Sequence, residues 1–271
     1  MALSLNVATG FGVPAPSSPV SESVTIGLGS HTAMFVIINL FTLGSFNTNP
    51  ITSLSVTYAG VSLTPANFLG STVPGCIQEV LTAVAGFWIV APTTGPNNLV
   101  ITYASGATVS YMGINVIACN GVDPTMPLGN HNTDGAPSGT LTSPLNVMNG
   151  DPGTPGAWWI TAVGLSYNTS ASETAPNSAK SQPSGTALTT LQSIQFGVLD
   201  FVYSFYSQAW PSGDNYENAV VYTTNPAEFT AMAFEIVAQP AQSQGKTKVF
   251  DTFMQNDETP LIENSQFLQE V

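Results

Sequence analysis

The sequence predicts an all-β protein, an antiparallel β-sandwich of jelly-roll type with an extended N-terminal arm and a C-terminal tail. One observation is a pair of short runs rich in β-branched and aromatic residues, 87–91 and 99–103, which flank a Pro, Thr, Gly and Asn cluster. Such runs indicate two neighbouring strands joined by a polar turn. The other is that ten or more strand-like runs follow one another along 271 residues, with no convincing helix between them. This spacing favours a sandwich over alternating strands and helices.

Composition divides the chain into four parts. Residues 1–21, rich in Pro, Ser, Val and Gly, predict an extended arm or a lead-in to the first strand. Residues 22–238 contain the strand candidates and form the predicted β-sandwich domain. Residues 239–245 (Gln-Pro-Ala-Gln-Ser-Gln-Gly) are typical of a linker. Residues 246–271 form a tail of different composition.

Within the domain, residues 33–42 are almost continuously apolar, which indicates a buried strand. Residues 51–58 alternate between apolar and hydroxyl side chains, as a strand with one face on the core does. Ala59 and Gly60 then break this strand, and 61–63 continue as a hairpin partner or past a bulge. Residues 120–138 predict a long polar connection, and 167–185 a surface loop. Further strands are expected at 23–26, 80–90, 99–103, 106–119, 141–148, 157–165, 186–206 (one or two strands), 219–223 and 229–237.

Charged residues are scarce and mostly acidic. Only 7% of the residues are charged, against about 25% in an average soluble domain, and the formal net charge is −13. There is no arginine, and the lysines are Lys180, Lys246 and Lys248. This balance argues against nucleic acid, which needs basic side chains to neutralise phosphate, and against an anionic membrane surface. It also offers trypsin-like proteases almost no cleavage points, which suits an extracellular particle or filament.

The sequence also bears on localisation. No run of about 18 apolar residues is present, so no membrane insertion is expected. The first residues, Met-Ala-Leu-Ser-Leu-Asn, have neither the basic nor the apolar region of a secretory signal. We therefore expect either a signal removed before this numbering, or release by another route such as virion assembly followed by lysis.

Two cysteines, Cys76 and Cys119, leave two interpretations open. In an oxidising setting they could form a disulfide. They could equally be two buried free thiols, because cysteine is among the most buried residue types. A metal site built on the two cysteines is not expected, because His31 and His131 are not at ligand spacing from either cysteine.

No catalytic constellation is evident. His31 follows Gly29 and Ser30, but the G-x-S-x-G elbow of a serine hydrolase does not occur. His131 lies in a polar stretch beside Asp134. Paired carboxylates for glycosidic cleavage gain no support from the spacing of Asp200, Asp214, Glu217 and Glu235. We therefore expect no enzyme activity and no cofactor.

Ion and sugar binding are weaker possibilities. Asp123, Asp134 and Asp151 lie in stretches rich in Gly and Asn and are weak calcium candidates. Without a D-x-D-x-D-G ligand run, solvated turn residues are the better interpretation, with Asp123 anchoring its own turn. Aromatic residues in the second half could form a sugar-stacking platform, although in strands about half should face the core: Trp158, Trp159, Tyr203, Phe205, Tyr206, Trp210, Tyr216 and Tyr222. Residues 168–170 (Asn-Thr-Ser) form a glycosylation sequon, meaningful only in a host that glycosylates it.

The tail carries two short apolar clusters behind the flexible linker. Their spacing can make helical faces, and they predict a docking arm for a neighbouring subunit. The alternative is a tail that packs back on its own sandwich. The predicted docking residues are Val249, Phe250, Phe253 and Met254 in the first cluster, and Leu261, Ile262, Phe267 and Leu268 in the second.

Four segments resemble a β-sandwich domain found in phage and prophage structural proteins and in some bacterial surface proteins. Residues 56–64 (VTYAGVSLT) are similar to its VTYxGxxLT hairpin, residues 87–102 to its WYLxxPxxGxxxVxVT segment, and residues 119–128 (CNGVDPTMPL) to its GVDxxxPL turn. Residues 231–236 (AMAFEI) resemble its closing strand. Together these cover roughly residues 20–238. Pro124 and Met126 stand where the pattern has polar residues, and the tail lies outside it. The motifs are structural, so the resemblance implies a fold and a setting without an active site.

The sequence thus predicts a structural subunit on the outside of a phage particle, such as a decoration, collar or fibre-associated protein. Its partners would be copies of itself and other virion proteins. One alternative is an extracellular bacterial or archaeal filament subunit or adhesin. Another is a carbohydrate-binding module, with surface glycans as its ligands.

Overall fold

The structure is a computed structural model, in which residues 1–240 form one compact unit. It describes residues 2–43, 51–66, 73–74, 76–78, 82–136, 145–150, 157–166, 178–182, 189–196, 200–207, 216–221 and 228–240. All of the regular structure in these residues is β-strand, and all of the strand pairs are antiparallel. The predicted all-β antiparallel class is confirmed.

The first half of the chain folds as a jelly roll, called here the first roll. Its central sheet has the order β1-β10-β3-β8, and its outer sheet has the order β2-β9-β4-β5. Successive strands cross between the two sheets, which is the connectivity of a jelly roll. The short strands β6 (Thr64–Pro65) and β7 (Cys76–Gln78) pair with β8. The eight main strands are β1 (Ser4–Pro14), β2 (Val20–Ile26), β3 (Ala33–Leu43), β4 (Ile51–Tyr58), β5 (Val61–Ser62), β8 (Thr82–Val90), β9 (Gly95–Ser105) and β10 (Thr108–Asn120).

The second half repeats this strand order and is called the second roll. Its facing sheet has the order β11-β18-β13-β16-β15, and its own outer sheet has the order β12-β17-β14. The positions of β1, β10, β3 and β8 are taken by β11, β18, β13 and β16. The difference is β15, which joins β16 where the first roll places β5 beside β4. The strands are β11 (Leu128–Ala136), β12 (Leu145–Gly150), β13 (Trp158–Ser166), β14 (Ser178–Gln182), β15 (Thr189–Phe196), β16 (Asp200–Ser207), β17 (Tyr216–Val221) and β18 (Glu228–Ile236).

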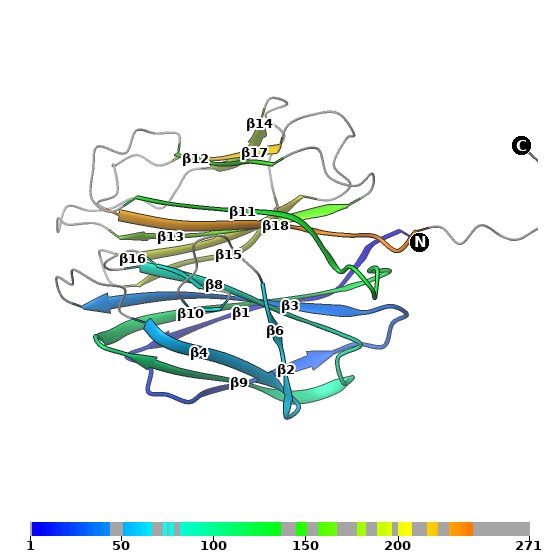
Figure 1. The fold of residues 1–271 in the computed structure, drawn as a ribbon, viewed down its shortest axis with the longest axis horizontal. Helices are drawn as coiled ribbons and strands as arrows, with labels where there is room; N and C mark the ends of the chain where they lie inside the picture. Colours follow the sequence, from blue (N-terminus) through cyan, green and yellow to red (C-terminus); the bar gives the residue numbers. More distant parts are fainter. Residues whose placement is uncertain are drawn as a thin grey trace, which may run out of the picture. The chain divides into compact units, whose positions relative to one another are not determined.

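The central sheet is covered on both faces (Figure 1). On one face it packs against the outer sheet of the first roll, and the buried side chains between them are called here the inner core. On the other face it packs against β13 and β18 of the facing sheet, and this contact is called the inter-roll interface. Residues 33–42 of β3 are all buried, with even-numbered side chains in the inner core and odd-numbered ones turned to the inter-roll interface. This is why the strand is apolar without alternation, and the predicted buried strand is confirmed.

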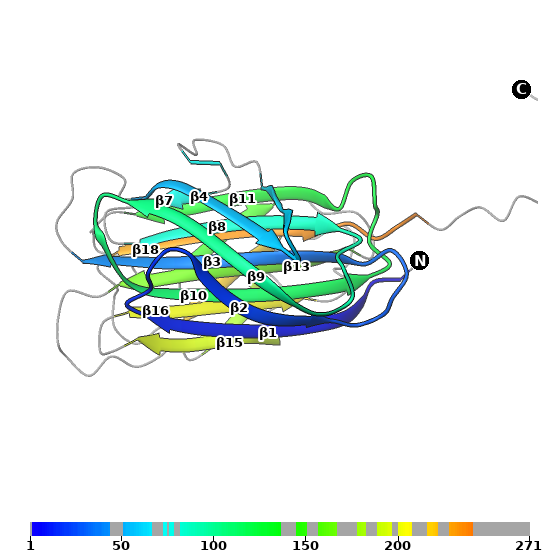
Figure 2. The ribbon, with the colours of Figure 1, turned by 90° about the horizontal axis from the view of Figure 1, so that it is seen from below.

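Residues predicted to form an arm belong to the first roll. β1 lies at the edge of the central sheet and pairs with β10 along its length (Figure 2). Val7, Phe11 and Val13 pack against the inner core. The extended conformation expected for this segment is present, but the boundary at residue 22 falls inside β2. Apolar residues at alternate positions are the signal of this strand, and the intervening glycines obscure it.

Two further strands lie in segments that the sequence predicts to be irregular. β11 occupies 128–136, within the predicted polar connection, and β14 occupies 178–182, within the predicted loop. Both pair through the backbone with a neighbouring strand, β11 with β18 and β14 with β17. Strand propensity is weak and depends on context, so pairing with a strong strand decides their conformation. The predicted stretch 186–206 contains two strands, β15 and β16.

Candidate functional site

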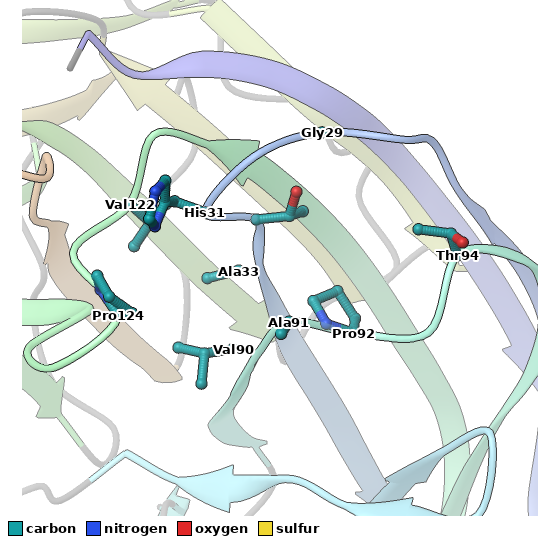
Figure 3. A pocket seen from close by; sticks show the side chains of 10 residues that line it. Gly29, His31, Ala33, Val90, Ala91, Pro92, Thr94, Val122 and Pro124 are labelled. Carbon is teal, nitrogen blue, oxygen red and sulfur yellow. The ribbon is translucent and has the colours of Figure 1, made fainter.

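A pocket of about 310 Å³ lies at one end of the first roll (Figure 3). Three segments line it: the loop between β2 and β3, the loop between β8 and β9, and the turn that follows β10. His31 and Val122 stand on one side of it, Pro92 and Thr94 on the other, and Ala33 lies between them. The lining residues are Gly29, His31, Thr32, Ala33, Val90, Ala91, Pro92, Thr94, Val122 and Pro124.

The walls of this pocket hold two residues in an unusual backbone conformation. His31 has φ 53° and Ala91 has φ 49°, in the left-handed region that side chains with a Cβ seldom adopt. Both are held by short backbone hydrogen bonds. The Ala91 N–H donates to the Thr32 carbonyl at 2.8 Å, and the Val122 N–H donates to the His31 carbonyl at 3.0 Å. Such conformations persist where the surroundings fix them, and they concentrate at functional sites.

A cluster of amide and hydroxyl groups fixes the loop between β2 and β3 from behind. The Asn120 Oδ1 atom accepts hydrogen bonds from Thr32 Oγ1 at 2.8 Å and from Asn6 Nδ2 at 3.0 Å. Asn6 Oδ1 in turn accepts the Gly27 N–H at 2.9 Å. Position 29 must be glycine for this packing, because a Cβ there would collide with the Asn120 side chain. The pocket is therefore preformed, because the loop between β2 and β3 is hydrogen-bonded to β1 and β10, and the loop between β8 and β9 is hydrogen-bonded to Thr32 in that loop.

Exposed apolar side chains gather on the segments around the pocket. The described residues include four exposed large hydrophobic side chains, and three of them belong to these segments or pair beside them. Leu28, next to Gly29, is 88% exposed, and Met126, just after the pocket turn, is 61% exposed. The third, Leu5, pairs with Cys119 at the end of β10. Apolar groups grouped around a concave site indicate a binding surface more than scattered exposure does.

The turn after β10 is stabilised by Asp123. Its Oδ1 atom accepts hydrogen bonds from the Thr125 N–H at 2.8 Å, the Thr125 hydroxyl at 2.7 Å and the Met126 N–H at 3.2 Å. The bond from the Thr125 hydroxyl is the main cause that lowers the pKa of this carboxyl, so Asp123 stays anionic at neutral pH. The predicted role of Asp123 as an anchor of its own turn is confirmed.

The other calcium candidates are not brought together with Asp123. Asp134 lies on β11, where its backbone pairs with Ala231, and Asp151 lies outside the described residues. Within the described ranges, no group of three or more His, Cys, Asp and Glu side chains is placed to hold a metal ion. His131 also lies on β11, opposite Phe234, whereas His31 lines the pocket.

No disulfide joins the two cysteines in the structure, so the disulfide interpretation does not hold in it. Cys76 belongs to the inner core and Cys119 to the inter-roll interface. The central sheet lies between the two thiols, which prevents a bond without rearrangement. Burial raises the pKa of each thiol to about 12. Neither group is a ready nucleophile near neutral pH.

The remaining predicted residues are only partly described. Trp158 and Trp159 are buried, so neither offers a free ring face for a sugar. Glu235 is buried on β18, while Asp200 and Glu217 lie on β16 and β17. Tyr203, Phe205 and Tyr206 also lie on β16, and Tyr216 begins β17. Residues 168–170, Trp210, Asp214, Tyr222 and all of the tail docking residues lie outside the described ranges.

The pocket itself was missed by sequence reasoning, because three loops far apart in the chain build it. The available signal was Leu28 beside Gly29, a large apolar residue in a short stretch of glycine and hydroxyl residues. Within the described part of the chain there is no helical segment with the length and apolar character that crossing a bilayer requires.

Comparison with protein-family models gave no match, and comparison with curated proteins gave none.

Proposed function

We propose that this protein is a structural subunit on the outside of a phage particle, and that it acts through contacts between subunits. The observation that carries the proposal is the occurrence of two jelly rolls in one chain, with matching strand order and stacked sheets. Jelly rolls recur in viral capsid proteins and in lectins, which agrees with the phage resemblance of residues 20–238.

The outer sheet of the first roll supports a role in contacts that do not depend on ion pairs. Its solvent face carries short hydroxyl side chains, among them Ser23, Thr25, Ser55 and Thr102, which are exposed at alternating strand positions. With few charges in the chain as a whole, such a face can approach another subunit at little desolvation cost. Exposed backbone at sheet edges adds a second mode of contact by strand addition.

Immunogold electron microscopy of particles released by the lysed source culture tests this function. We expect gold on the outside of phage particles, and native mass measurement of the purified protein should show a closed oligomer. Gold on cell-attached filaments instead of particles would overturn the proposal in favour of the filament subunit. Saturable binding to a glycan array by a protein absent from particles would overturn it in favour of the carbohydrate-binding module.

A further inference from the structure

We infer that the pocket at the end of the first roll receives the C-terminal tail of a second copy of this chain, through the segment 246–254. This deepens the proposed function, because it takes the protein to be a repeated subunit. Three observations support the inference: the pocket is preformed, the described chain ends beside it, and two of the three lysines lie in the tail.

The described chain ends beside the pocket. Ala238 forms a bridge with Val122, which lines the pocket, and the Gln239 N–H donates to the Gly121 carbonyl at 2.8 Å. The sequence continues for residues 241–271 beyond this point. An extended chain covers about 3.3 Å per residue, so that length is ample to reach a neighbouring molecule.

Exit and pocket therefore share one end of the first roll. When two copies meet at this end around a two-fold axis, each tail starts close to the pocket of the other copy. Such an isologous contact repeats the same interaction twice. It would also cover Leu28 and Met126, the two most exposed large apolar side chains among the described residues.

Charge and apolar pattern favour this segment as the occupant. Two of the three lysines of the chain, Lys246 and Lys248, directly precede Val249 and Phe250. The pocket offers apolar walls for the two apolar side chains of the tail segment. The anionic Asp123, which the lysines would meet, lies between the lining residues Val122 and Pro124. In a chain with a net charge of −13, the pairing of these lysines with the carboxylate also fixes the orientation of the tail in the pocket.

Photo-crosslinking of the full chain tests the inference. A benzophenone amino acid at position 250 is introduced, and labelled and unlabelled chains of different isotope composition are mixed before irradiation. We expect crosslinks to the loops 28–33, 90–94 or 122–126, in peptides that join one labelled and one unlabelled chain. Crosslinks confined to single chains would show a tail packed on its own body and overturn the inference, as would no crosslink to these loops.

A matched pair of substitutions gives the second readout. Thr94 lines the pocket and is exposed, whereas Thr93 is exposed and does not line it. We expect Thr94→Trp to fill the pocket and raise the dissociation constant of the oligomer at least about tenfold, with Thr93→Trp within about twofold of the parent. Equal effects of the two variants would contradict the pocket assignment.

The two proposals can fail separately. If the Thr94→Trp variant keeps the oligomer affinity of the parent and the protein is still found on particles, the pocket is not the binding site of the tail, and the virion role stands. A protein absent from particles, but with crosslinks joining the tail to the pocket loops between copies, would refute the virion role alone.

Discussion

Both faces of the central sheet are buried, yet they differ in the polar groups that they enclose. The inner core is apolar apart from Thr42, which pairs with Val109, and the hydroxyl of Tyr58, which donates to the carbonyls of Val24 and Gly95 at 3.2 Å. The inter-roll interface has an apolar part around Phe35, Ile37 and Phe234. Its other part contains Asn39 and Asn115, whose buried side-chain amides have no hydrogen-bond partner within the described part of the chain.

The register shows why these amides lie in the same region. Asn39 pairs with Gly113, so Asn39 and Asn115 lie on the same face of neighbouring strands, β3 and β10. Across the interface, Gly164 approaches both Asn39 and Thr230, and the buried hydroxyl of Thr230 likewise has no hydrogen-bond partner among the described residues. Buried polar groups of this kind destabilise the contact that encloses them. This difference shows that the strands of the first roll enclose the inner core by themselves. The inter-roll interface instead mixes apolar and polar residues, as an interface between two separately folded units does.

The largest effect should come from two adjacent isoleucines of β3. Ile38 lies in the inner core and Ile37 in the inter-roll interface, and both are fully buried. We expect Ile38→Ala to lower the free energy of unfolding by about 4 kcal/mol and Ile37→Ala by about 2 kcal/mol, because a joint between rolls relaxes around a cavity more easily. Urea unfolding of both variants measures this. Equal losses would show that the two faces are packed alike.

For each thiol and each pH unit, a smaller effect is expected at alkaline pH. Burial raises the pKa of Cys76 and Cys119 to about 12 from 9.0, so between these values the folded state holds protons that the unfolded state has released. The thiol contribution is therefore complete below pH 9 and is lost as the pH rises toward 12, by about 1.4 kcal/mol per pH unit for each thiol.

The free energy of unfolding of Cys76→Ala and Cys119→Ala, measured between pH 9 and 11, gives the contribution of the thiol on each face of the central sheet. Because both thiols are buried, each substitution should remove about half of the thiol contribution to the slope. A much smaller change for Cys119→Ala would indicate that water reaches the inter-roll interface and would sharpen the contrast between the faces.

The smallest effect is expected at Asn39. Asn39→Ala removes an unpaired buried amide, and the relief of that cost offsets the small cavity, so stability should change by less than about 1 kcal/mol. Asn120→Ala is the control, because its amide oxygen accepts two hydrogen bonds, and its loss removes the acceptor of Thr32 Oγ1 and one of the acceptors of Asn6 Nδ2. We expect that control to cost about 1–2 kcal/mol in the same urea assay. A larger loss for Asn39→Ala than for Asn120→Ala would reverse the interpretation of the interface.

Much of the first roll could be predicted from the sequence, because its signals are local. The apolar run of β3 and the alternation of residues 51–58 depend only on which face of a strand each side chain takes. The turn role of Asp123 likewise involves residues only two and three positions away. Strand β11 could not be predicted in the same way, because its polar residues form a strand only through pairing with β18.

The sequence by itself determined the β class, the scarcity of charge, the buried strand β3 and the separate composition of the tail, since each follows from residue type and short-range order. Only the tertiary structure decided that there are two rolls, that β1 belongs to the first, that the cysteines lie on opposite faces, and that three distant loops enclose a pocket. These features depend on which strands pair across more than a hundred residues, as β1 does with β10. Strand pairing over such distances is set by the packing of the whole chain and leaves no local mark in the sequence.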